Sequence, residues 1–498
     1  MTDRYDVGII GYGACAAVLV ELLLQKGVNV VVFDKWPDVL GIPRAAHADD
    51  ETMRNFQAVG VIDDIPDAIE ASNNYYVYNA MDEVVGGFTE MTRDRTPQGY
   101  LSDYFFFQPD IERYLRKKAA ERGAAIKLNC EVTNVEEVAD GVRISFKDGN
   151  SASPDRVRHV VVDYAVGADG ANSFVRDLLG FEMEQLAEPQ RWMICDIQLH
   201  EGLGADLSKD SWTKVTAEET ITFVPMAKNM KRFEFSIPDD LDEAAVGSPE
   251  AIERFIAKWF AREDYDLLRA HIYHFHSLVA CQWRKGRVLI AGDAAHRAPP
   301  FLGQGVCTAI RDAVNLAWKL ERVVHGRSSD ALLDSYFADR YPHAHALTRI
   351  AGEIGDNLKW MATATQAELA AMKGQQFDHT QARPHVGGGL HMATAIAGGE
   401  LSPQPVLADG RLLDYHVGYN FALVGDPAVL SGLSASTTAL LRDLDAVVVA
   451  DDSKAVRDAI GGLGGSVMFL RPDRYLLGIC SSASEVDDMV RKLTETLR

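Results

Sequence analysis

Apolar and polar positions along the chain follow two different periods, and together they predict an α/β protein. Residues 5–34 contain an apolar run, a glycine turn, a helix-forming stretch ended by Gly27, and a second β-branched run ending at Asp34. This succession is typical of a strand, a helix and a second, parallel strand. An apolar run followed by a turn and a helical pattern recurs at 161–180 and at 287–320. These segments predict a parallel sheet with helices packed on it.

Three later stretches have different patterns. Between residues 190 and 283 apolar and polar residues alternate, most clearly in ITFVPMA, KRFEFSI and IYHFHSLVA, which predicts a largely antiparallel sheet. Residues 372–405 contain the glycine clusters VGGG and AGG, and we expect them to form a mobile connection. From residue 406 onward an α/β pattern returns and predicts a separate small domain.

Composition narrows the function classes. The 498 residues, 47% of them hydrophobic, are enough for several domains of about 150 residues each. The formal net charge is −22 and no run of Lys or Arg occurs, so nucleic acids and anionic membranes are disfavoured as partners. No signal peptide and no membrane-length apolar stretch is visible. The six cysteines form no CxxC pair, which indicates free thiols in a reducing compartment, and we expect a cytoplasmic protein.

The histidines of one predicted strand raise the question of a metal site. They are His271, His274 and His276. No carboxylate or thiol occurs at a suitable spacing from them, so we expect no metal site.

The first glycine turn, GYGACA, predicts a dinucleotide site. Gly11 permits the tight turn, Gly13 leaves room for a pyrophosphate against the backbone, and Ala16 lets helix and strand pack closely. The following helix N-terminus offers unpaired N–H groups to phosphates, and Asp34 lies where a carboxylate accepts hydrogen bonds from a ribose. The same glycines also suit ordinary strand–helix packing, and it is Asp34 that favours the nucleotide.

Two further turns have the same character. Asp293 follows the apolar run 288–291, at a strand end where ligands of α/β sheets gather. Gly303 and Gly305 precede a helix and can direct backbone N–H groups at an anionic or electron-rich ligand. Asp169 lies in an equivalent turn, GADGANSFVR. Together the three turns predict three contacts to one extended cofactor.

These motifs resemble, in order and spacing, the three FAD fingerprints of the single-component flavoprotein aromatic hydroxylases. The stretches PRAAHADDETMRNFQAVG, FFFQPDIERYL, KRFEFSI, IRDAVNLAWKL and LRPDRYLLG are similar to the 3-(3-hydroxyphenyl)propionate hydroxylase branch of that family. The resemblance covers nearly the whole chain and is specific for FAD and monooxygenation, but poorly specific for substrate.

The resemblance implies a Rossmann-like FAD-binding domain with an inserted, largely antiparallel β-sheet substrate domain and a C-terminal thioredoxin-like domain. The implied boundaries are 1–75, 106–182 and 284–370 for the FAD-binding domain, 76–105 and 183–283 for the substrate domain, 371–405 for a linker, and 406–498 for the thioredoxin-like domain. Because this last domain lacks a CxxC pair, we expect it to serve packing or dimerisation and not disulfide chemistry. A homodimer is compatible with this interpretation.

The resemblance also implies a chemistry. NADH or NADPH, bound transiently, delivers hydride to FAD, the reduced flavin captures O2 as a C4a-hydroperoxide, and one oxygen passes to a phenolic or heteroaromatic ring. The protein must exclude water and favour ionisation of the phenol. An FAD-dependent oxidase or dehydrogenase without oxygen insertion is the alternative, because its FAD contacts would be the same.

Cofactor contacts are carried over from the family position by position. Arg44 matches an arginine along the pyrophosphate, Gln108 a glutamine at the sugar-phosphate arm, and Asp293 an aspartate on the ribityl chain. Asp169 matches a residue associated with both FAD and the nicotinamide cofactor. The loop 299–305 matches the segment that lines the isoalloxazine. The full implied cofactor-binding set is Gly11, Gly13, Ala14, Cys15, Asp34, Lys35, Arg44, Gln108, Asp169, Asp293, Pro300, Gly303, Gly305, Val306 and Cys307.

Two catalytic and three further substrate-binding candidates complete the predicted site. His47, placed by the resemblance beside the isoalloxazine, can assist phenol deprotonation; the alternative is a packing or flavin-contacting histidine. Pro300, in the isoalloxazine loop, is the second catalytic candidate. Arg232 can meet a substrate carboxylate, although a solvated strand position is the competing interpretation. Trp192 and Phe223 suit an aromatic-lined pocket, but aromatic residues on strands more often belong to the core.

The sequence also departs from the family near the predicted pocket. Ala14, Cys15 and Ala16 occupy positions where relatives usually have Pro and Gly, which puts cofactor affinity in question. The proline pair in APPFLGQG differs from the propionate hydroxylase branch as well. The expected substrates therefore extend to other phenols and heteroaromatic rings.

Overall fold

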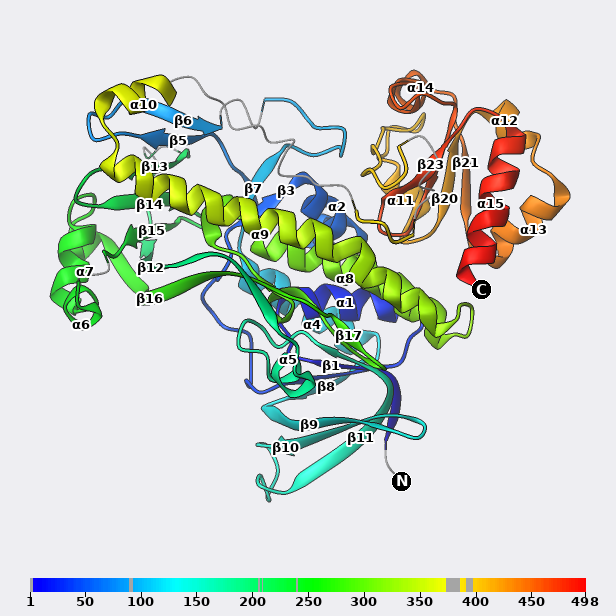
Figure 1. Cartoon of the computed structure of the whole chain (residues 1–498), viewed down its shortest axis with the longest axis horizontal. Coiled ribbons are helices and arrows are strands. Elements are labelled where there is room, and N and C mark those ends of the chain that lie inside the picture. The colour runs from blue at the N-terminus through cyan, green and yellow to red at the C-terminus, as the bar shows by residue number, and fades with distance from the viewer. Residues whose placement is uncertain are drawn as a thin grey trace.

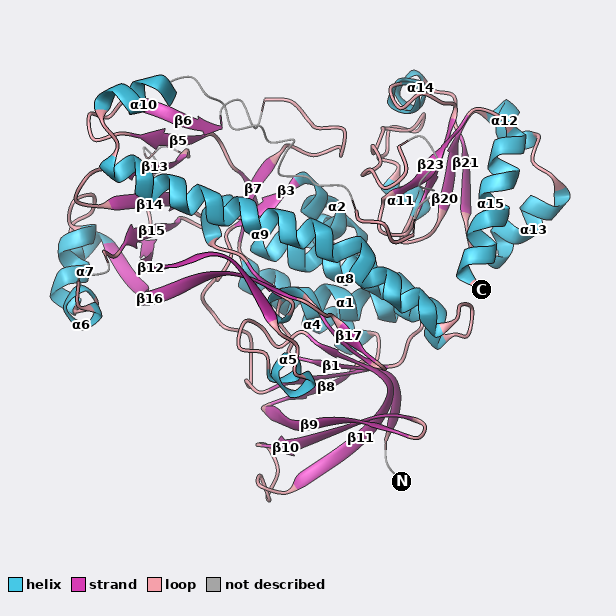
Figure 2. Ribbon diagram, viewed as in Figure 1, coloured by secondary structure: helices cyan, strands magenta, loops and turns pink. Residues whose placement is uncertain are grey.

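Four sheets, flanked by helices, organise the described part of the chain (Figure 1, Figure 2). The structure is a computed structural model that describes residues 3–88, 93–204, 207, 209–238, 241–372, 386–390 and 397–498. Within these residues the strands form two eight-stranded sheets, one sheet of four strands and one of three. The architecture is mixed α/β, as the sequence pattern predicts.

The first large sheet is built around the predicted strand–helix–strand unit. Its order is β17-β18-β11-β1-β2-β8, with β10 paired to β11 and β9 to β10. β1 pairs in parallel with β2 and β11, β2 with β8, and β11 with β18, so the carboxyl ends of these strands meet at one edge. The strands are β1 (Arg4–Ile10), β2 (Val30–Asp34), β8 (Ala125–Leu128), β9 (Cys130–Val138), β10 (Gly141–Asp148), β11 (Val157–Gly167), β17 (Arg284–Lys285) and β18 (Val288–Ile290).

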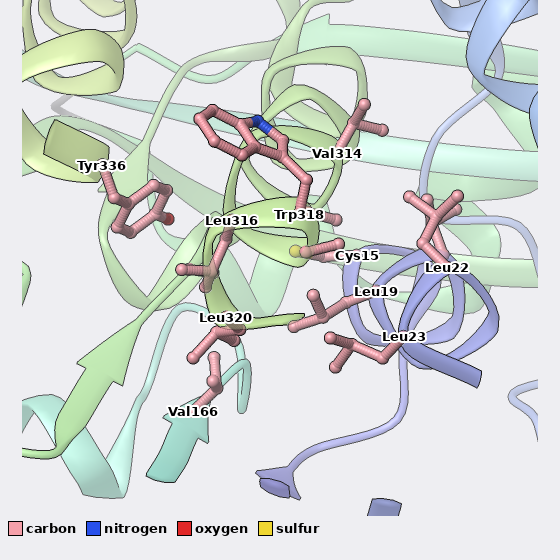
Figure 3. Close-up of a cluster of buried hydrophobic side chains, with 14 of the residues drawn as sticks. Cys15, Leu19, Leu22, Leu23, Val166, Val314, Leu316, Trp318, Leu320 and Tyr336 are labelled. Atoms are coloured by element: carbon pink, nitrogen blue, oxygen red, sulfur yellow. The ribbon is translucent and has the colours of Figure 1, made fainter. Parts of the chain in front are cut away.

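Helices α1 (Ala14–Gln25) and α8 (Gly305–Val324) pack against each other in the core beside this sheet. The sequence of α1 is apolar on nearly every side, and a helix of that kind is stable only when it is buried. Figure 3 shows Leu19 and Leu23 of α1 in the same cluster as Leu316 and Leu320 of α8. This packing fixes the two helix N-termini, which follow the first and third glycine turns.

The second large sheet has the order β19-β16-β12-β15-β14-β13-β5-β6 and is antiparallel except for the β5–β13 pair. Alternation places one set of side chains in a core with α7 and leaves the other set on the opposite face. The strands are β5 (Tyr75–Tyr78), β6 (Val84–Phe88), β12 (Met183–Leu199), β13 (Ser211–Val215), β14 (Thr220–Pro225), β15 (Met230–Ser236), β16 (Tyr265–Ala280) and β19 (His296–Arg297).

The third sheet has three strands and contains His47. Its order is β3-β7-β4, from β3 (His47–Asp49), β7 (Asp103–Phe106) and β4 (Ile69–Ala71). The β3–β7 register pairs His47 with Phe105 and Asp49 with Asp103, which brings the His47 and Asp103 side chains together.

The C-terminal part forms its own four-stranded sheet with the order β21-β20-β22-β23. β20 (Ala422–Gly425) pairs in parallel with β21 (Val447–Ala450) and antiparallel with β22 (Val467–Leu470), which pairs antiparallel with β23 (Leu476–Cys480). Figure 1 shows this unit at one end of the molecule, next to α8 and α9. Its helices are α11 (Asp414–Val417), α12 (Pro427–Ser431), α13 (Ala435–Asp443), α14 (Lys454–Gly461) and α15 (Ala483–Leu497).

The structure describes only part of the glycine-rich connection. Most of the segment from 373 to 396 lies outside the described residues. Within 386–390, Val386 and Leu390 are buried, and the backbone N–H groups of Gly387 and Leu390 donate to Asp339. This short stretch is packed on α9.

The remaining elements are short, apart from the 30-residue helix α9. They are α2 (Asp50–Ala58), α3 (Val61–Asp64), α4 (Gln108–Glu121), α5 (Phe174–Leu179), α6 (Glu243–Val246), α7 (Pro249–Ile256), α9 (Asp334–Thr363), α10 (Gln366–Met372), and the 3-10 turns Pro66–Ala68, Arg262–Asp264, Gly292–Ala294, Pro300–Leu302 and Asp330–Leu333. Among the described residues, no helix combines the length and the apolar character needed to cross a bilayer.

Candidate active site

A cavity of about 1880 Å³ lies between the carboxyl edge of the parallel sheet and the inner face of the antiparallel sheet. It exceeds the size range of ordinary small-molecule pockets, so it has room for an extended cofactor together with a substrate. Most predicted site residues line it: Gly11, Gly13, Ala14, Cys15, Asp34, Lys35, Arg44, His47, Gln108, Asp169, Arg232, Asp293, Pro300, Gly303, Gly305 and Val306. Trp192, Phe223 and Cys307 do not.

The first turn is shaped by a glycine that no other residue can replace without strain. Gly11 has φ +91°, and a Cβ atom there would lie 2.4 Å from the carbonyl oxygen of Ala168. Gly13 is the N-cap of α1 and supplies no capping side chain, so the first N–H groups of the helix face the cavity. Asp34, at the end of β2, lies 3.0 Å from Arg116 and accepts a hydrogen bond from the Trp36 backbone.

The segment after β2 is held by the Gln108 amide. Its Oε1 atom accepts hydrogen bonds from the backbone N–H groups of Arg44 (3.1 Å) and Ala45 (2.9 Å), and its Nε2 atom donates to Glu112 (2.6 Å). The side chain of Arg44 is 56% exposed and lies 3.7 Å from Glu112, so its guanidinium has donors to spare at the cavity wall. Gln108 thus acts on the cofactor side of the cavity through the backbone it positions.

Two aspartates end neighbouring strands of the parallel sheet. Asp169 accepts hydrogen bonds from the Ser173 hydroxyl and the Val175 backbone, which organise the turn into α5, and burial raises the pKa of Asp169. Asp293 follows β18 and is exposed to the cavity. Both side chains lie at the edge where α/β sheets bind their ligands.

The loop that precedes α8 carries a second essential glycine. Gly303 has φ +63°, and a Cβ atom there would lie 2.7 Å from Nδ1 of His47. Gln304 is the N-cap of α8 without a capping hydrogen bond from its side chain, and Gly305 has open space around its Cβ position. The N-terminus of this 20-residue helix therefore opens onto the cavity with free N–H groups.

His47 and Asp103 form a close pair beside that loop. Nε2 of His47 lies 2.7 Å from Oδ1 of Asp103, and Nδ1 lies 3.1 Å from the carbonyl oxygen of Gly303. A carbonyl can only accept, so Nδ1 carries a proton, while Nε2 faces a carboxylate. Burial alone would lower the pKa of His47, but the Asp103 carboxylate raises it well above its usual value. The protonated form of His47 is therefore favoured, with Nδ1 directed at the Gly303 carbonyl and Nε2 facing the Asp103 carboxylate.

Arg232 does not occupy the solvated position that one interpretation gave it. It is buried, and four of its five N–H groups donate to Asp196, to the Pro43 carbonyl and to the Arg44 carbonyl. Arg269 also binds Asp196 and the Pro43 carbonyl. These contacts clamp the 43–44 segment to the antiparallel sheet, so the predicted contact of Arg232 with a substrate carboxylate is not what this geometry favours.

Three predicted residues lie behind the cavity wall, two of them on strands and Cys307 on α8. Phe223 points into the core with Trp212 and Phe233, whereas its neighbours Thr222 and Val224 line the cavity. Trp192 is buried against Phe301, which is itself a wall residue. The side chain of Cys307 turns back into the protein, toward the carbonyls of His47 and Gly303.

Sequence reasoning missed several polar residues of the wall. They are Tyr75, Asp103, Thr222 and Glu234. Glu234 was detectable: in KRFEFSI it is two positions from Arg232, so both share the strand face opposite to Phe233 and Phe235. Asp103 was hidden, because only the pairing of β3 with β7 brings it to His47.

The cavity and its wall define a class of protein: the FAD binding domain family matches residues 4–351. The donor set suits FAD, since uncapped N-termini of α1 and α8 face an elongated cavity and glycines at both turns keep it clear of side chains.

The relatives give the family in more detail. The probable NADH-specific resorcinol 4-hydroxylase of Rhodococcus jostii (strain RHA1) is 32% identical over 98% of this chain and 94% of that protein. A 3-(3-hydroxy-phenyl)propionate/3-hydroxycinnamic acid hydroxylase of Mycolicibacterium smegmatis is 28% identical over 95% of this chain and 90% of that protein. The crystal structure of aklavinone-11 hydroxylase with FAD and aklavinone has the same fold, with a TM-score of 0.82 and 21% identity over 99% of this chain and all of that one.

The chain therefore belongs to the FAD binding domain family of flavoprotein aromatic hydroxylases. It is an FAD-dependent monooxygenase that uses NAD(P)H and O2 to hydroxylate an aromatic ring, and the predicted enzyme class and cofactor are confirmed.

Proposed function

We propose that this enzyme hydroxylates a monocyclic phenol, with NADH as the reductant. The relative from Rhodococcus jostii is named for resorcinol and NADH, and the relative from Mycolicibacterium smegmatis for a hydroxyphenyl acid; both substrates are single phenol rings. The observation that carries the proposal is the close pair of His47 and Asp103 at the cavity wall, next to the loop before α8.

The residues proposed to hold FAD divide by position along the cavity. The N-terminus of α1, with Gly11, Gly13, Ala14 and Cys15, faces the pyrophosphate, with Asp34 and Lys35 toward the ADP half. Arg44, whose guanidinium lies beside Gly13, belongs with the pyrophosphate group. The second group lies toward the flavin end: Gln108, Asp169, Asp293, Pro300, Gly303, Gly305 and Val306. When bound, FAD supplies the hydride acceptance and oxygen activation that no side chain can provide.

The role proposed for His47 is electrostatic. Because Nδ1 is directed at the Gly303 carbonyl and Nε2 lies 2.7 Å from the Asp103 carboxylate, neither nitrogen is placed as a vacant base for the phenol proton. A cation in a low-dielectric wall instead lowers the pKa of a phenol bound beside it, so the phenolate is populated at neutral pH. A phenolate ring is richer in electrons and accepts oxygen more readily.

Water exclusion is the second task of the wall. The apolar side chains Ile194, Val224, Phe275, Phe301 and Ile354 line the cavity on the sheet and α9 side. They keep the reacting ring in a dry region, where side reactions with water are suppressed.

The experiment that tests the proposed function measures coupling. The holoenzyme is incubated with NADH, O2 and a panel of single-ring phenols, and NADH consumption is compared with the amount of product that has gained one oxygen. We expect at least one phenol to give near-stoichiometric product. If every phenol that speeds NADH oxidation yields hydrogen peroxide alone, the proposal is wrong.

We also infer a thioredoxin-like C-terminal unit and an inserted substrate domain. The order β21-β20-β22-β23, with one parallel pair followed by antiparallel pairs, supports the first. The separate antiparallel sheet, whose strands come from 75–88, 183–236 and 265–297, supports the second. The six cysteines are all free thiols, which supports a cytoplasmic location.

A further inference from the structure

Glu234 is a charged residue of the antiparallel sheet that lines the cavity without a hydrogen-bond or ion-pair partner among the described residues. Its side chain is only 6% exposed, yet it lines the cavity from β15. Among the described residues it forms no hydrogen bond and no ion pair within 4.0 Å. A buried carboxylate of this kind is costly unless it finds a donor. The cavity is the side from which that donor can come.

Glu234 has polar neighbours on the adjacent strands. On the neighbouring strand, Thr222 is its direct partner in the β14–β15 register. The Thr222 hydroxyl is 2.7 Å from that of Thr213, which is 2.7 Å from the hydroxyl of Tyr75. Burial, together with the nearby charge of Glu234, raises the pKa of Tyr75 to about 12, so this chain of hydroxyls stays protonated. Thr222 and Tyr75 line the cavity as Glu234 does.

The charges nearby are already balanced. Arg232 and Arg269 both bind Asp196 and the backbone of the 43–44 segment. With Glu234 ionised, the two cations and two carboxylates sum to zero. A substrate carboxylate placed here would meet Glu234 and no vacant cation, whereas a neutral hydroxyl would meet an acceptor.

Burial raises the pKa of Glu234 to about 7, with Arg232 opposing the shift and Asp196 adding to it. A donor from the substrate stabilises the ionised form, so substrate binding and ionisation of Glu234 favour each other.

We propose that Glu234 is a specificity-determining residue that accepts a hydrogen bond from a second hydroxyl on a neutral aromatic substrate. The inference rests on the proposed function and refines its substrate class to dihydroxylated neutral rings, against phenols that carry an acidic side chain.

The test compares resorcinol with 3-methoxyphenol, which has the same ring and first hydroxyl but no second donor, and with 3-(3-hydroxyphenyl)propionate. Dissociation constants are measured by calorimetry on the FAD-loaded enzyme, and kcat/KM by product formation. The variants are Glu234→Leu, Glu234→Gln and the matched control Glu218→Gln, an exposed carboxylate in the turn before β14.

In the wild type we expect resorcinol to bind most tightly. Glu234→Leu should weaken resorcinol by about 10- to 150-fold, the value of a hydrogen bond to a charged group, and leave 3-methoxyphenol nearly unchanged. Glu234→Gln, whose amide oxygen still accepts, should lose less, and Glu218→Gln should lose nothing. Flavin content and Tm of each variant identify any that fail to fold, in which case Glu234→Gln alone decides.

The proposal is overturned if the Glu234 variants weaken resorcinol and 3-methoxyphenol equally, or if the wild type binds the propionate as tightly as resorcinol. Failure of the proposed function has a different signature: no phenol gains an oxygen in the wild type, while the calorimetric preference for resorcinol is still measured.

Discussion

The two walls of the cavity present different chemical groups: one presents mainly backbone and the other mainly side chains. On the edge of the parallel sheet, the surface consists largely of backbone: glycine turns and the uncapped N-termini of α1 and α8. On the antiparallel sheet, it consists of side chains that project from strands, with paired charges at Asp196, Arg232 and Arg269. Backbone N–H groups suit any phosphate or electron-rich ring edge, while projecting side chains discriminate between small molecules. We call the edge of the parallel sheet the cofactor wall and the antiparallel sheet the substrate wall. The cofactor wall can bind the same cofactor in many enzymes, whereas the side chains of the substrate wall determine which substrate this enzyme selects.

The largest expected effect comes from a substitution in the first glycine turn of the cofactor wall. Gly11→Ala places a Cβ atom 2.4 Å from the Ala168 carbonyl oxygen at a positive φ, and that backbone conformation alone costs about 1–2 kcal/mol for an L residue. We expect FAD affinity to fall by more than about tenfold, the equivalent of 1.4 kcal/mol. FAD titration of the purified apoprotein measures it.

Gly27→Ala is the control, because Gly27 also has a positive φ but nothing lies within 4 Å of its Cβ position. It should lose stability and keep its FAD. Equal losses of FAD in both variants would show that general strain, and not the shape of the turn, governs binding.

The next effect tests the pair of His47 and Asp103, which lie on the three-stranded sheet and line the cavity. Replacing the imidazole with His47→Gln should lower kcat for a simple phenol by about 100-fold, the low end of what removal of one preorganised electrostatic group costs. A ring-fluorinated phenol, which ionises more readily, should lose less. His274→Gln, a cavity histidine paired with Glu243 at a half-exposed position, is the control and should be close to wild type. A loss independent of phenol acidity would refute the electrostatic role.

A pH profile sharpens the same point. The pKa of His47 is raised, so its cation persists to higher pH than that of an ordinary histidine and is lost as the pH rises through that raised value. The rate with a phenol should fall on the alkaline side. In Asp103→Asn the partner that raises the pKa is gone, so the fall should begin at lower pH. The profile of kcat against pH for both proteins measures it, and identical profiles would contradict the assignment.

The smallest expected effect concerns a chain of hydrogen bonds that connects the C-terminal unit to the start of α8. Tyr475 of the C-terminal unit donates to Glu51 (2.9 Å), Glu51 binds Arg311 (2.6 Å), and Arg311 donates to Gln304 (2.9 Å) at the start of α8. Tyr475→Phe should cost about 1 kcal/mol of stability and speed FAD release slightly. Tyr415→Phe, whose hydroxyl binds Asp63 at an exposed position, is the control. Thermal melts and FAD release rates measure the difference. Similar values for the two variants would show that the chain of contacts does not reach the loop.

The difference between the walls also explains how far the sequence could be interpreted. The cofactor wall could be predicted because each of its turns is a short motif in the sequence. Gly11, Asp169 and Gly303 each follow a predicted strand or precede a predicted helix, so their motifs predict the sheet edge on which they meet. The substrate wall depends on which side of a strand faces the cavity. Phe223 was misplaced because an alternating strand offers two faces and its composition does not say which is core. The partnership of His47 with Asp103 depends on a strand pairing across more than fifty residues of sequence, for which no local signal exists.

The contact between the C-terminal unit and the body limits how the chain can be cut. Arg471 lies fully buried against Asp339 of α9, which also holds Lys319 of α8. A chain ending before the last hairpin would leave Asp339 with fewer charge partners in a dry interior and would free Glu51 from Tyr475, next to the loop that frames the reaction. The C-terminal unit therefore cannot be removed without exposing these contacts. A chimaera that replaces it with the C-terminal unit of another enzyme must keep Arg471 and Tyr475.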